Sequence, residues 1–228
     1  MTSSAQIDRL AAQIHDARHT LDRRQQKIAL TLLRLLAEGA PVPIERLAEA
    51  VDLSPGQAEQ TIDRWPEAQR DDRGHFTAFM GLSIPHIGHH RLHLHGGRTV
   101  SAWCAWDTLF LPELLGETAR VTSRCAATGA EISLAISPAG PTDLQPATTT
   151  MSFVIPERKF GSDVINDFCR YVHFLASSEA AAGWIEGHPG TFELSIEDGY
   201  RLGHLSNAAH VRQRPRPTSR QLGDLTDA

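Results

Sequence analysis

Apolar residues recur at three- and four-residue steps through the first third of the chain, which is the spacing of helices that bury one face. Three helices and a closing strand are predicted, over residues 7–38, 43–51, 54–65 and 75–82. Gly39 and Pro41 end the first helix, and Ser54 with Pro55 forms an N-cap and first-turn signal for the third. Two short helices joined by a tight corner and followed by a strand are typical of a winged helix. We therefore predict a winged-helix-like helical domain over residues 1–82.

Beyond Gly81 the helical spacing gives way to short strand-like segments separated by turns. Hairpins are predicted around Gly96-Gly97 and Thr128-Gly129, because glycine supplies the positive φ angles of tight turns. The other predicted elements are helices over 103–115, 162–168 and 179–186 and strands over 151–155 and 171–176. The predicted fold class is α+β, with the N-terminal domain followed by a mixed α/β domain with antiparallel hairpins over residues 83–210. Residues 211–228 carry arginines among prolines with few apolar side chains, and they are predicted to be a disordered tail.

The composition narrows the class of protein. The chain of 228 residues has a formal net charge of −5 and a hydrophobic fraction of 41%, which is typical of a globular protein and argues against broad attraction to nucleic acid or anionic membranes. No stretch approaches the roughly 18 consecutive apolar residues of a membrane-spanning helix, and the polar N-terminus has no apolar signal core. Three cysteines cannot all pair within one chain, which argues against a secreted, disulfide-stabilised domain. We therefore expect a soluble, cytoplasmic protein with reduced thiols.

Cys104 and Asp107 have the clearest potential for chemistry. Their three-residue spacing places both on one face of the helix predicted over residues 103–115, among aromatic side chains. A carboxyl group beside a thiol in an apolar pocket has a raised pKa, whereas a helix N-terminus lowers the pKa of a thiol. The two groups can therefore share one proton at neutral pH. The alternative is a cysteine that packs as a small apolar residue and an aspartate that only caps the helix.

Five histidines lie within ten residues, at His86, His89, His90, His93 and His95. In a strand, His93 and His95 face the same side and form a candidate metal pair. No Asp or Glu lies among the five, although hydrolytic zinc sites usually include a carboxylate. A solvated hairpin edge is therefore favoured over a metal site.

The other two cysteines, Cys125 and Cys169, carry no local motif. No pair of cysteines has the two-residue gap of a redox motif or of a zinc ribbon. Considered alone, each is interpreted as a core residue.

Three segments taken together resemble a known family. Residues 103–109 (Trp-Cys-Ala-Trp-Asp-Thr-Leu), 118–129 (with Cys-Ala-Ala-Thr-Gly at its end) and 168–177 (Phe-Cys-Arg-Tyr-Val-His-Phe-Leu-Ala-Ser) are similar to the alkylmercury (organomercurial) lyases and follow the family's order. The resemblance runs from about Gly81 to Trp184, and weakly through the N-terminal helices. It implies that residues 83–210 form a catalytic alkylmercury lyase domain, which cleaves carbon–mercury bonds by protonolysis and releases a hydrocarbon and Hg(II) in mercury detoxification.

The resemblance also implies roles for individual residues. Cys104 and Cys169 correspond to the two mercury-binding thiols, and Cys125 to a structural cysteine. Asp107 corresponds to the acid and is also expected to bind the mercury of substrate and product. The resemblance implies that the reaction needs no cofactor and that Hg(II) is bound as its product. It also implies that external thiols are needed for turnover and that a mercuric reductase is a candidate recipient of Hg(II). Arg170 stands where some relatives have a further cysteine, a difference that bears on substrate preference.

The chemistry of mercury supports these roles. Mercury is a soft cation that prefers thiolate sulfur, and thiolates make the carbon bound to it easier to protonate. A positioned acid is worth roughly a hundred- to ten-thousand-fold in rate, and Asp107 can take a proton from a thiol and return it to the leaving carbon. The apolar side chains of Trp103, Trp106 and Phe110 suit an alkyl or aryl group and exclude water.

Two alternatives use the same cysteines without catalysis. A winged-helix transcription regulator could sense mercury, but the helix over residues 54–65 carries Arg64 with the acidic Glu59 and Asp63, a poor surface for phosphates. A non-catalytic mercury-binding protein would hold Hg(II) tightly and release no hydrocarbon. The expected partners are therefore organomercury compounds and cellular thiols, not nucleic acid or membranes.

Overall fold

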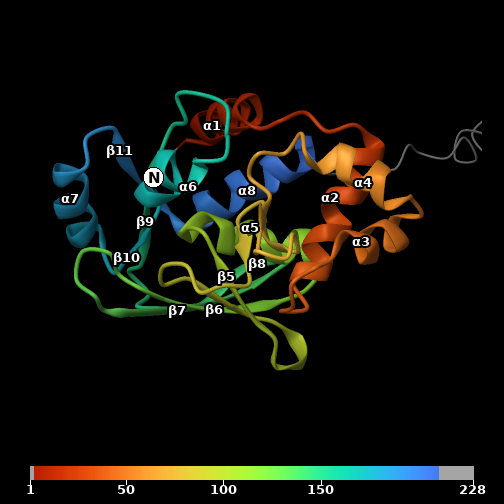
Figure 1. The fold of residues 1–228 in the computed structure, drawn as a ribbon. Coiled ribbons are helices and arrows are strands. Elements are labelled where there is room, and N and C mark those ends of the chain that lie inside the picture. The colour runs from red at the N-terminus through yellow and green to blue at the C-terminus, as the bar shows by residue number, and fades with distance from the viewer. Residues whose placement is uncertain (1–2, 211–228) are drawn as a thin grey trace, which may run out of the picture.

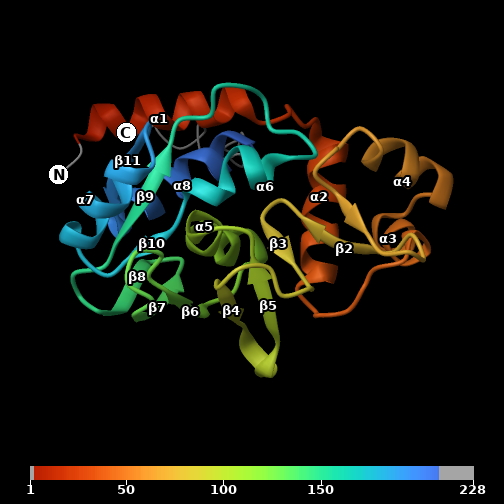
Figure 2. The same cartoon turned by 60° about the vertical axis from the view of Figure 1, so that its left-hand side comes forward.

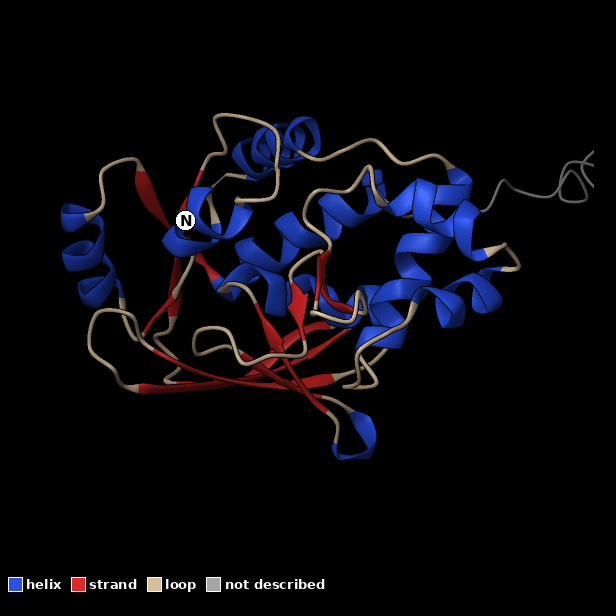
Figure 3. Ribbon diagram, in the orientation of Figure 1, coloured by secondary structure: helices blue, strands red, loops and turns tan. Residues whose placement is uncertain are grey.

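The computed structural model describes residues 3–210, which form a mixed α/β structure (Figure 3). Its α-helices are α1 (Ser4–Ala17), α2 (Arg23–Leu36), α3 (Ile44–Val51), α4 (Pro55–Ile62), α5 (Ala105–Leu115), α6 (Val164–Asp167), α7 (Ser178–Gly187) and α8 (Ile196–His210). Its strands are β1 (Gln69–Arg70), β2 (Phe76–Phe79), β3 (Leu82–Ser83), β4 (Arg91–His93), β5 (Thr99–Ala102), β6 (Ala119–Arg124), β7 (Glu131–Ser137), β8 (Gly140–Gln145), β9 (Thr150–Val154), β10 (Phe174–Leu175) and β11 (Thr191–Ser195). Short 3₁₀ turns lie at His95–Gly97 and Cys169–Tyr171.

The N-terminal helical region begins with two helices, so the single helix predicted over residues 7–38 is wrong. The backbone N–H of Gln25 donates to the Asp22 carboxylate (2.9 Å), and the Asp22 N–H donates to the Gln25 side chain (2.8 Å). This reciprocal capping box starts α2 as a separate helix. The apolar spacing is helical on both sides of the linker, which is why the pattern alone did not reveal the break.

The two short helices that follow agree with the prediction. α4 begins at the Ser54 N-cap, whose side chain accepts from the Gln57 N–H (3.3 Å). The strand predicted over residues 75–82 is divided, because Met80 (φ 46°) and Gly81 (φ 91°) turn the chain between β2 and β3. This turn becomes important below, since it faces the candidate site.

The larger sheet contains eight strands in residues 3–210, all paired antiparallel, in the order β1-β2-β3-β5-β4-β6-β7-β8. The two predicted hairpins supply β4–β5 and β6–β7. Burial alternates along β7, where Ile132, Leu134 and Ile136 face the core. β3 pairs with β5, so the sheet continues from the N-terminal helical region into the rest of the chain.

A second sheet, in the order β10-β9-β11, is formed by three strands of the described part of the chain. Only Phe174 and Leu175 of the strand predicted over residues 171–176 are paired in it. Tyr171, at the start of the predicted strand, belongs instead to the 3₁₀ turn that begins at Cys169. The helix predicted over residues 162–168 is present in shortened form as α6.

The helices α5 and α8 form the centre of the molecule. Figures 1 and 2 show them between the larger sheet and α1, and α8 contacts both α1 and α5. Every residue of α5 except Glu113 is buried. A helix enclosed on all sides holds the side chains at its N-terminus rigidly, because its neighbours leave no room for movement.

No element was predicted over α8, although it covers α5. Two glycines in it allow close packing: a Cβ at Gly203 would lie 2.7 Å from the Cβ of Phe110, and the Gly199 carbonyl accepts from the Trp106 indole N–H (3.0 Å). Glycine weakens a helix locally, so this helix depends on tertiary contacts that a sequence pattern does not reveal.

No helix within residues 3–210 combines the length and the apolar character that crossing a membrane requires. The tail predicted over residues 211–228 lies outside the described residues.

Candidate active site

The N-terminal turn of α5 brings Cys104 and Asp107 together. Cys104 is the N-cap residue of α5, and its backbone N–H donates to Oδ2 of Asp107 (2.8 Å). A carboxylate at the third helical position commonly accepts this bond, which satisfies a backbone group that the helix leaves unpaired. The alternative considered from the sequence is therefore partly right, since Asp107 does cap the helix. The same bond also fixes its carboxyl group beside the Cys104 side chain.

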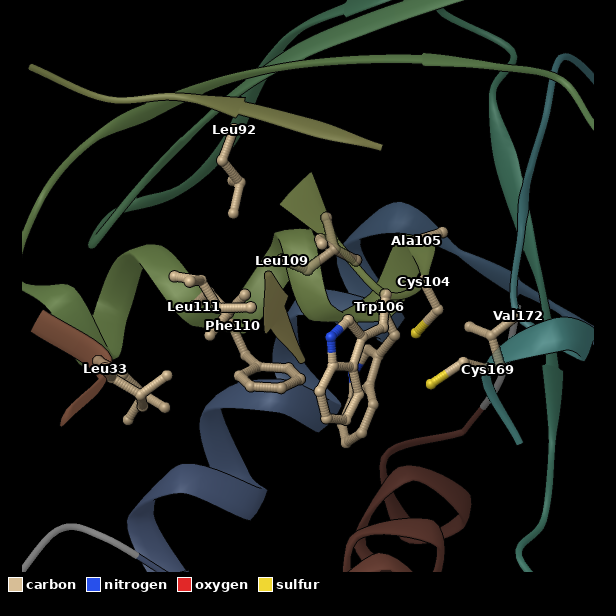
Figure 4. Close-up of a cluster of buried hydrophobic side chains, with 14 of the residues drawn as sticks. Leu33, Leu92, Cys104, Ala105, Trp106, Leu109, Phe110, Leu111, Cys169 and Val172 are labelled. Atoms are coloured by element: carbon tan, nitrogen blue, oxygen red, sulfur yellow. The ribbon is translucent and has the colours of Figure 1, made fainter. Parts of the chain in front are cut away.

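Cys169 reaches the same point from the 3₁₀ turn after α6. The backbone N–H of Ala105 donates to the Val172 carbonyl (3.1 Å), which ties the start of α5 to this turn. One ligand atom from each of Cys104, Asp107 and Cys169 lies within 4.8 Å of the others, and all three residues are buried. Figure 4 shows the two sulfur atoms facing each other beside Trp106. The structure thus brings together the three residues that the sequence analysis selected, across 65 residues of chain.

Burial controls the protonation of all three groups. It raises the pKa of the Cys104 thiol well above its ordinary value, and its hydrogen bond to Cys169 and the nearby Asp107 act in the same direction. The same hydrogen bond lowers the pKa of Cys169, but burial and Asp107 outweigh it, so the net direction is upward. Burial raises the pKa of Asp107 to about 7, against the opposing effects of Cys104 and the Arg18 charge. At neutral pH the thiols are therefore protonated, and Asp107 is poised between its two forms.

Asp107 and Cys169 line a pocket that is walled mainly by apolar side chains. Trp103, Trp106 and Phe110, which were predicted to wall it, all line it. The rings of Trp106 and Phe110 lie edge to face, with centroids 4.9 Å apart. Such walls exclude water and accommodate an apolar group.

The sequence analysis did not identify several residues of the pocket. The α1–α2 linker, the loop between α4 and β1, the turn between β2 and β3, and the segment from the loop before α6 to its C-cap also line it, through Arg18, His19, Glu67, Met80, Gly81, Phe160, Val164 and Phe168. Apart from Phe168, which begins the third family-like segment, none of these residues lies in a motif that signals a site. The aromatic Phe160 and Phe168, whose centroids are 5.1 Å apart, are indistinguishable in sequence from ordinary core residues.

Two family models match the chain. The model described as alkylmercury lyase matches residues 87–206, and the model described as the helix-turn-helix domain of alkylmercury lyase matches residues 7–79. The chain belongs to the alkylmercury lyase family. The resemblance found in the sequence is thereby confirmed.

Curated relatives support this membership. A protein named alkylmercury lyase from Streptomyces lividans is 39% identical over 75% of this chain and 78% of its own length. Proteins of the same name from Pseudomonas putida and Staphylococcus epidermidis are 38% and 33% identical over 77% and 81% of this chain, and over 81% and 83% of their own lengths. The crystal structure of the mercury-bound form of MerB2 has a TM-score of 0.72 and 22% identity, and the match covers 90% of this chain and 99% of that chain. It shows that the fold is shared.

Gly81 lets the turn between β2 and β3 approach Asp107 in this alkylmercury lyase family member. Its φ of +91° favours glycine, and an added Cβ would lie 2.5 Å from Oδ1 and 2.6 Å from Cγ of Asp107. Its carbonyl accepts from the Trp103 N–H (2.9 Å). The turn therefore closes one side of the carboxyl group.

Cys125 lies apart from the other two cysteines. It is buried directly after β6, and its sulfur accepts from the Ala176 N–H (3.3 Å). This bond joins β6 to the segment after β10, as expected of a structural cysteine.

The histidine cluster does not assemble a metal site. Within residues 3–210, Cys104, Asp107 and Cys169 are the only group of three or more His, Cys, Asp or Glu residues close enough to share an ion. His93 instead contacts the side-chain hydroxyls of Thr99 (3.1 Å) and Thr122 (2.9 Å). The cluster is also not simply a solvated edge, because His90 is buried against Ser123 (2.9 Å).

His90 is expected to make the protein less stable as the pH falls below 6.5. Burial, and secondarily the neighbouring His173, lowers its pKa from 6.5 to about 3, so the unfolded chain takes up a proton that the native protein does not. The contribution of His90 to the free energy of unfolding therefore falls by about 2 kcal/mol between pH 7 and pH 5. The raised pKa of Asp107 acts in the opposite direction over this range, so His90 is tested by comparing the wild type with His90→Asn in urea unfolding at both pH values. The difference in free energy of unfolding between these two proteins should change by about 2 kcal/mol. The exposed control His95→Asn should keep the pH dependence of the wild type, and equal pH dependence in both variants would refute the assignment.

Proposed function

We propose that this chain cleaves the carbon–mercury bond of alkyl- and arylmercury compounds by protonolysis, and that Cys104, Asp107 and Cys169 carry the reaction. The observation that supports these roles best is the convergence of two buried thiols and one buried carboxyl group within 4.8 Å, beside a pocket with mainly apolar walls that Asp107 and Cys169 line. The chain's membership of the alkylmercury lyase family supports the reaction itself. A mercury-bound form is known for the structurally similar MerB2.

Binding begins with an exchange of thiols. The substrate arrives as an organomercury cation on a small carrier thiol, and Cys169 displaces that thiol, which leaves with the Cys169 proton. Asp107 takes the proton of the neighbouring Cys104, whose thiolate becomes the second sulfur on mercury. Soft mercury strongly prefers these sulfurs to oxygen or nitrogen, which offsets the cost of forming buried thiolates.

Cleavage then needs one proton at the carbon. Two thiolates donate electron density to mercury and make the attached carbon more basic. The protonated Asp107 delivers its proton to that carbon, the carbon–mercury bond breaks, and Hg(II) stays on the two sulfurs. One thiol proton thus appears in the hydrocarbon and the other on the carrier thiol. Burial favours the neutral acid in this step, because the pocket walls keep water away.

Release of Hg(II) completes the cycle. A buried bis-thiolate site binds mercury too tightly for simple dissociation, so we propose that external thiols exchange with Cys104 and Cys169 and carry the ion away. Cellular thiols fill this role, and a mercuric reductase is a candidate for the next recipient. The reaction as proposed uses no cofactor.

We propose that the winged-helix-like domain over residues 1–82 covers the active site of the catalytic domain over residues 83–210. Residues from the α1–α2 linker and from the turn before β3 line the pocket, and β3 pairs with β5. Its α4 offers little to nucleic acid, because Glu59 there pairs with Arg70 (2.8 Å). The regulator alternative is therefore not favoured.

The direct test is the release of benzene from phenylmercury by the purified full chain in excess 2-mercaptoethanol. Gas chromatography of the headspace should detect benzene in proportion to the enzyme and to time. Tight binding of Hg(II) without benzene would instead identify a non-catalytic mercury-binding protein.

Gly81→Ala is expected to reduce benzene release by at least about a hundredfold, because the new methyl group displaces the Asp107 carboxyl from the reacting carbon. Steady-state rates and thermal melting would be compared with those of Gly74→Ala. Gly74 has a similar φ of +79° but open space around it, so that variant carries the backbone strain without the clash. Equal activity losses in the two variants would contradict the role given to Gly81.

A further inference from the structure

Arg18 places a buried positive charge in the wall of the candidate active site. It is 8% exposed and lines the pocket together with Asp107 and Cys169. Its guanidinium carbon lies 5.4 Å from the Trp106 ring centroid and 5.1 Å from that of Phe110. Cation–π contacts of this kind favour the charge but accept none of its hydrogen bonds.

One nitrogen of this guanidinium has no acceptor. Nη1 of Arg18 is fully buried and has no hydrogen-bond partner among residues 3–210. A charged group with a buried, unpaired donor lowers the stability of the folded protein, and such donors normally form a hydrogen bond with a carboxylate. The pocket wall therefore contains a desolvated cation with one unpaired donor.

The backbone holds Arg18 at this position. Its N–H donates to the carbonyls of Ile14 (3.1 Å) and His15 (3.2 Å) at the end of α1. On either side of it, the Phe160 N–H donates to the Ala17 carbonyl (2.8 Å), and the His19 ring contacts the Phe160 carbonyl (3.0 Å). Because its backbone is fixed and its buried guanidinium packs against two rings, Arg18 loses little conformational freedom when it binds a ligand.

We propose that Arg18 binds a carboxylate carried by one of the two ligands of the incoming mercury, either the organic group or the carrier thiol. This inference rests on the proposed function, since it assigns a substrate subsite to the same pocket. A guanidinium matches a carboxylate in shape and can donate two parallel hydrogen bonds to it. The apolar walls strengthen the pair because they exclude water.

Glu67 is expected to weaken the binding of a carboxylate at this subsite. It lines the same pocket, and its Oε2 is also buried without a hydrogen-bond partner in the described part of the chain. An ionised Glu67 would repel a ligand carboxylate, whereas a neutral amide in its place would not. The variant Glu67→Gln should therefore improve the binding of carboxylate-bearing ligands.

The experiment measures KM for benzene or benzoate release by the full chain, and compares a carboxylate-bearing ligand with an uncharged one in each of two arms. In the first arm, 4-mercuribenzoate is compared with phenylmercury, both in 2-mercaptoethanol. In the second arm, phenylmercury is supplied with 3-mercaptopropionate or with 2-mercaptoethanol. Arg18→Met removes the charge and keeps an apolar side chain, and Arg18→Lys keeps the charge without the planar fork. Arg70→Met is the matched control, since Arg70 also lies over a ring, that of Phe76 (3.9 Å), but does not line the pocket.

In each arm the ratio is the KM measured with the carboxylate-bearing substrate or thiol, divided by the KM measured with its uncharged counterpart. Arg18→Met should raise this ratio by about tenfold or more in at least one arm, which is the size expected for a lost charge-assisted hydrogen bond. Arg18→Lys should give a smaller rise, and Arg70→Met should leave the ratio unchanged. The first arm responds if the organic group carries the carboxylate, and the second if the carrier thiol does. Unchanged ratios in both arms would overturn the proposal and assign Arg18 to packing or to balancing the Asp107 charge.

Two further readouts keep the outcomes distinct. If circular dichroism shows that Arg18→Met is unfolded, the variant Glu67→Gln provides the test. It should lower the same KM ratio in the responding arm. An unchanged ratio in both arms would overturn the proposal. Wild-type protein that releases no benzene from phenylmercury would refute the proposed function. Benzene release with KM ratios that do not depend on residues 18 and 67 refutes only the carboxylate subsite.

Discussion

Replacing Cys169 by alanine is expected to reduce benzene release from phenylmercury by at least about a thousandfold. The remaining Cys104 can still bind the organomercury cation, but one thiolate activates the carbon less than two. Hg(II) would also lose half of the pair that holds it as product. Single-turnover measurement of benzene by gas chromatography gives the rate of the chemical step separately from the thiol-dependent release of mercury.

Cys104→Ala should show a loss of similar size, since the two sulfurs act as one unit. Cys125→Ser provides the matched control, because it removes the third thiol but keeps an acceptor for the Ala176 N–H. Its rate should stay within about threefold of the wild type, as for other changes outside a site. A Cys169→Ala variant that cleaves phenylmercury at an undiminished rate would exclude the two-thiol mechanism.

Asp107→Asn is expected to lower the rate of benzene release by about a hundred- to ten-thousand-fold. Hg(II) supplied on two carrier thiols should still bind both sulfurs, because the released carriers take up the two cysteine protons. Asparagine keeps an oxygen that can accept from the Cys104 N–H, so the start of α5 should be preserved. The amide can neither take the thiol proton nor deliver one to carbon. Ultraviolet absorption of the mercury–thiolate bonds measures binding, and headspace analysis measures cleavage in the same sample.

The pH profile tests the same residue by a different route. Because the pKa of Asp107 in the free protein is about 7, kcat/KM should fall as the pH drops below 7 and the carboxylate needed to deprotonate Cys104 is lost. Asp107→Asn should lack this dependence in its residual activity. Cleavage by Asp107→Asn at the wild-type rate, or an unchanged profile around pH 7, would show that another group moves the proton.

Local patterns predicted those parts of the fold that local contacts stabilise. The Ser54 cap, the two glycine-turn hairpins and the apolar helix after Trp103 all agree with the structure. The break between α1 and α2 was missed because apolar spacing is helical on both sides, and the Asp22–Gln25 capping box that causes it is short. α8 was missed because its glycines are stabilised by contact with α5 and not by helix propensity.

The sequence by itself determined the chemistry of this protein: three segments in order identified the family, and the three-residue step from Cys104 to Asp107 placed a thiol beside a carboxyl group. Spacing along one helix is a local property, so it can be deduced from the order of residues. The resemblance implied that Cys169 joins this pair, but only the tertiary structure shows the three groups meeting and the pKa of Asp107 raised to about 7, since both depend on contacts between distant segments. The same is true of Gly81 and Arg18, which reach the pocket from the N-terminal region and carry no motif. A site enclosed by separate elements is defined by contacts across the fold, and those contacts leave little trace in any single stretch of sequence.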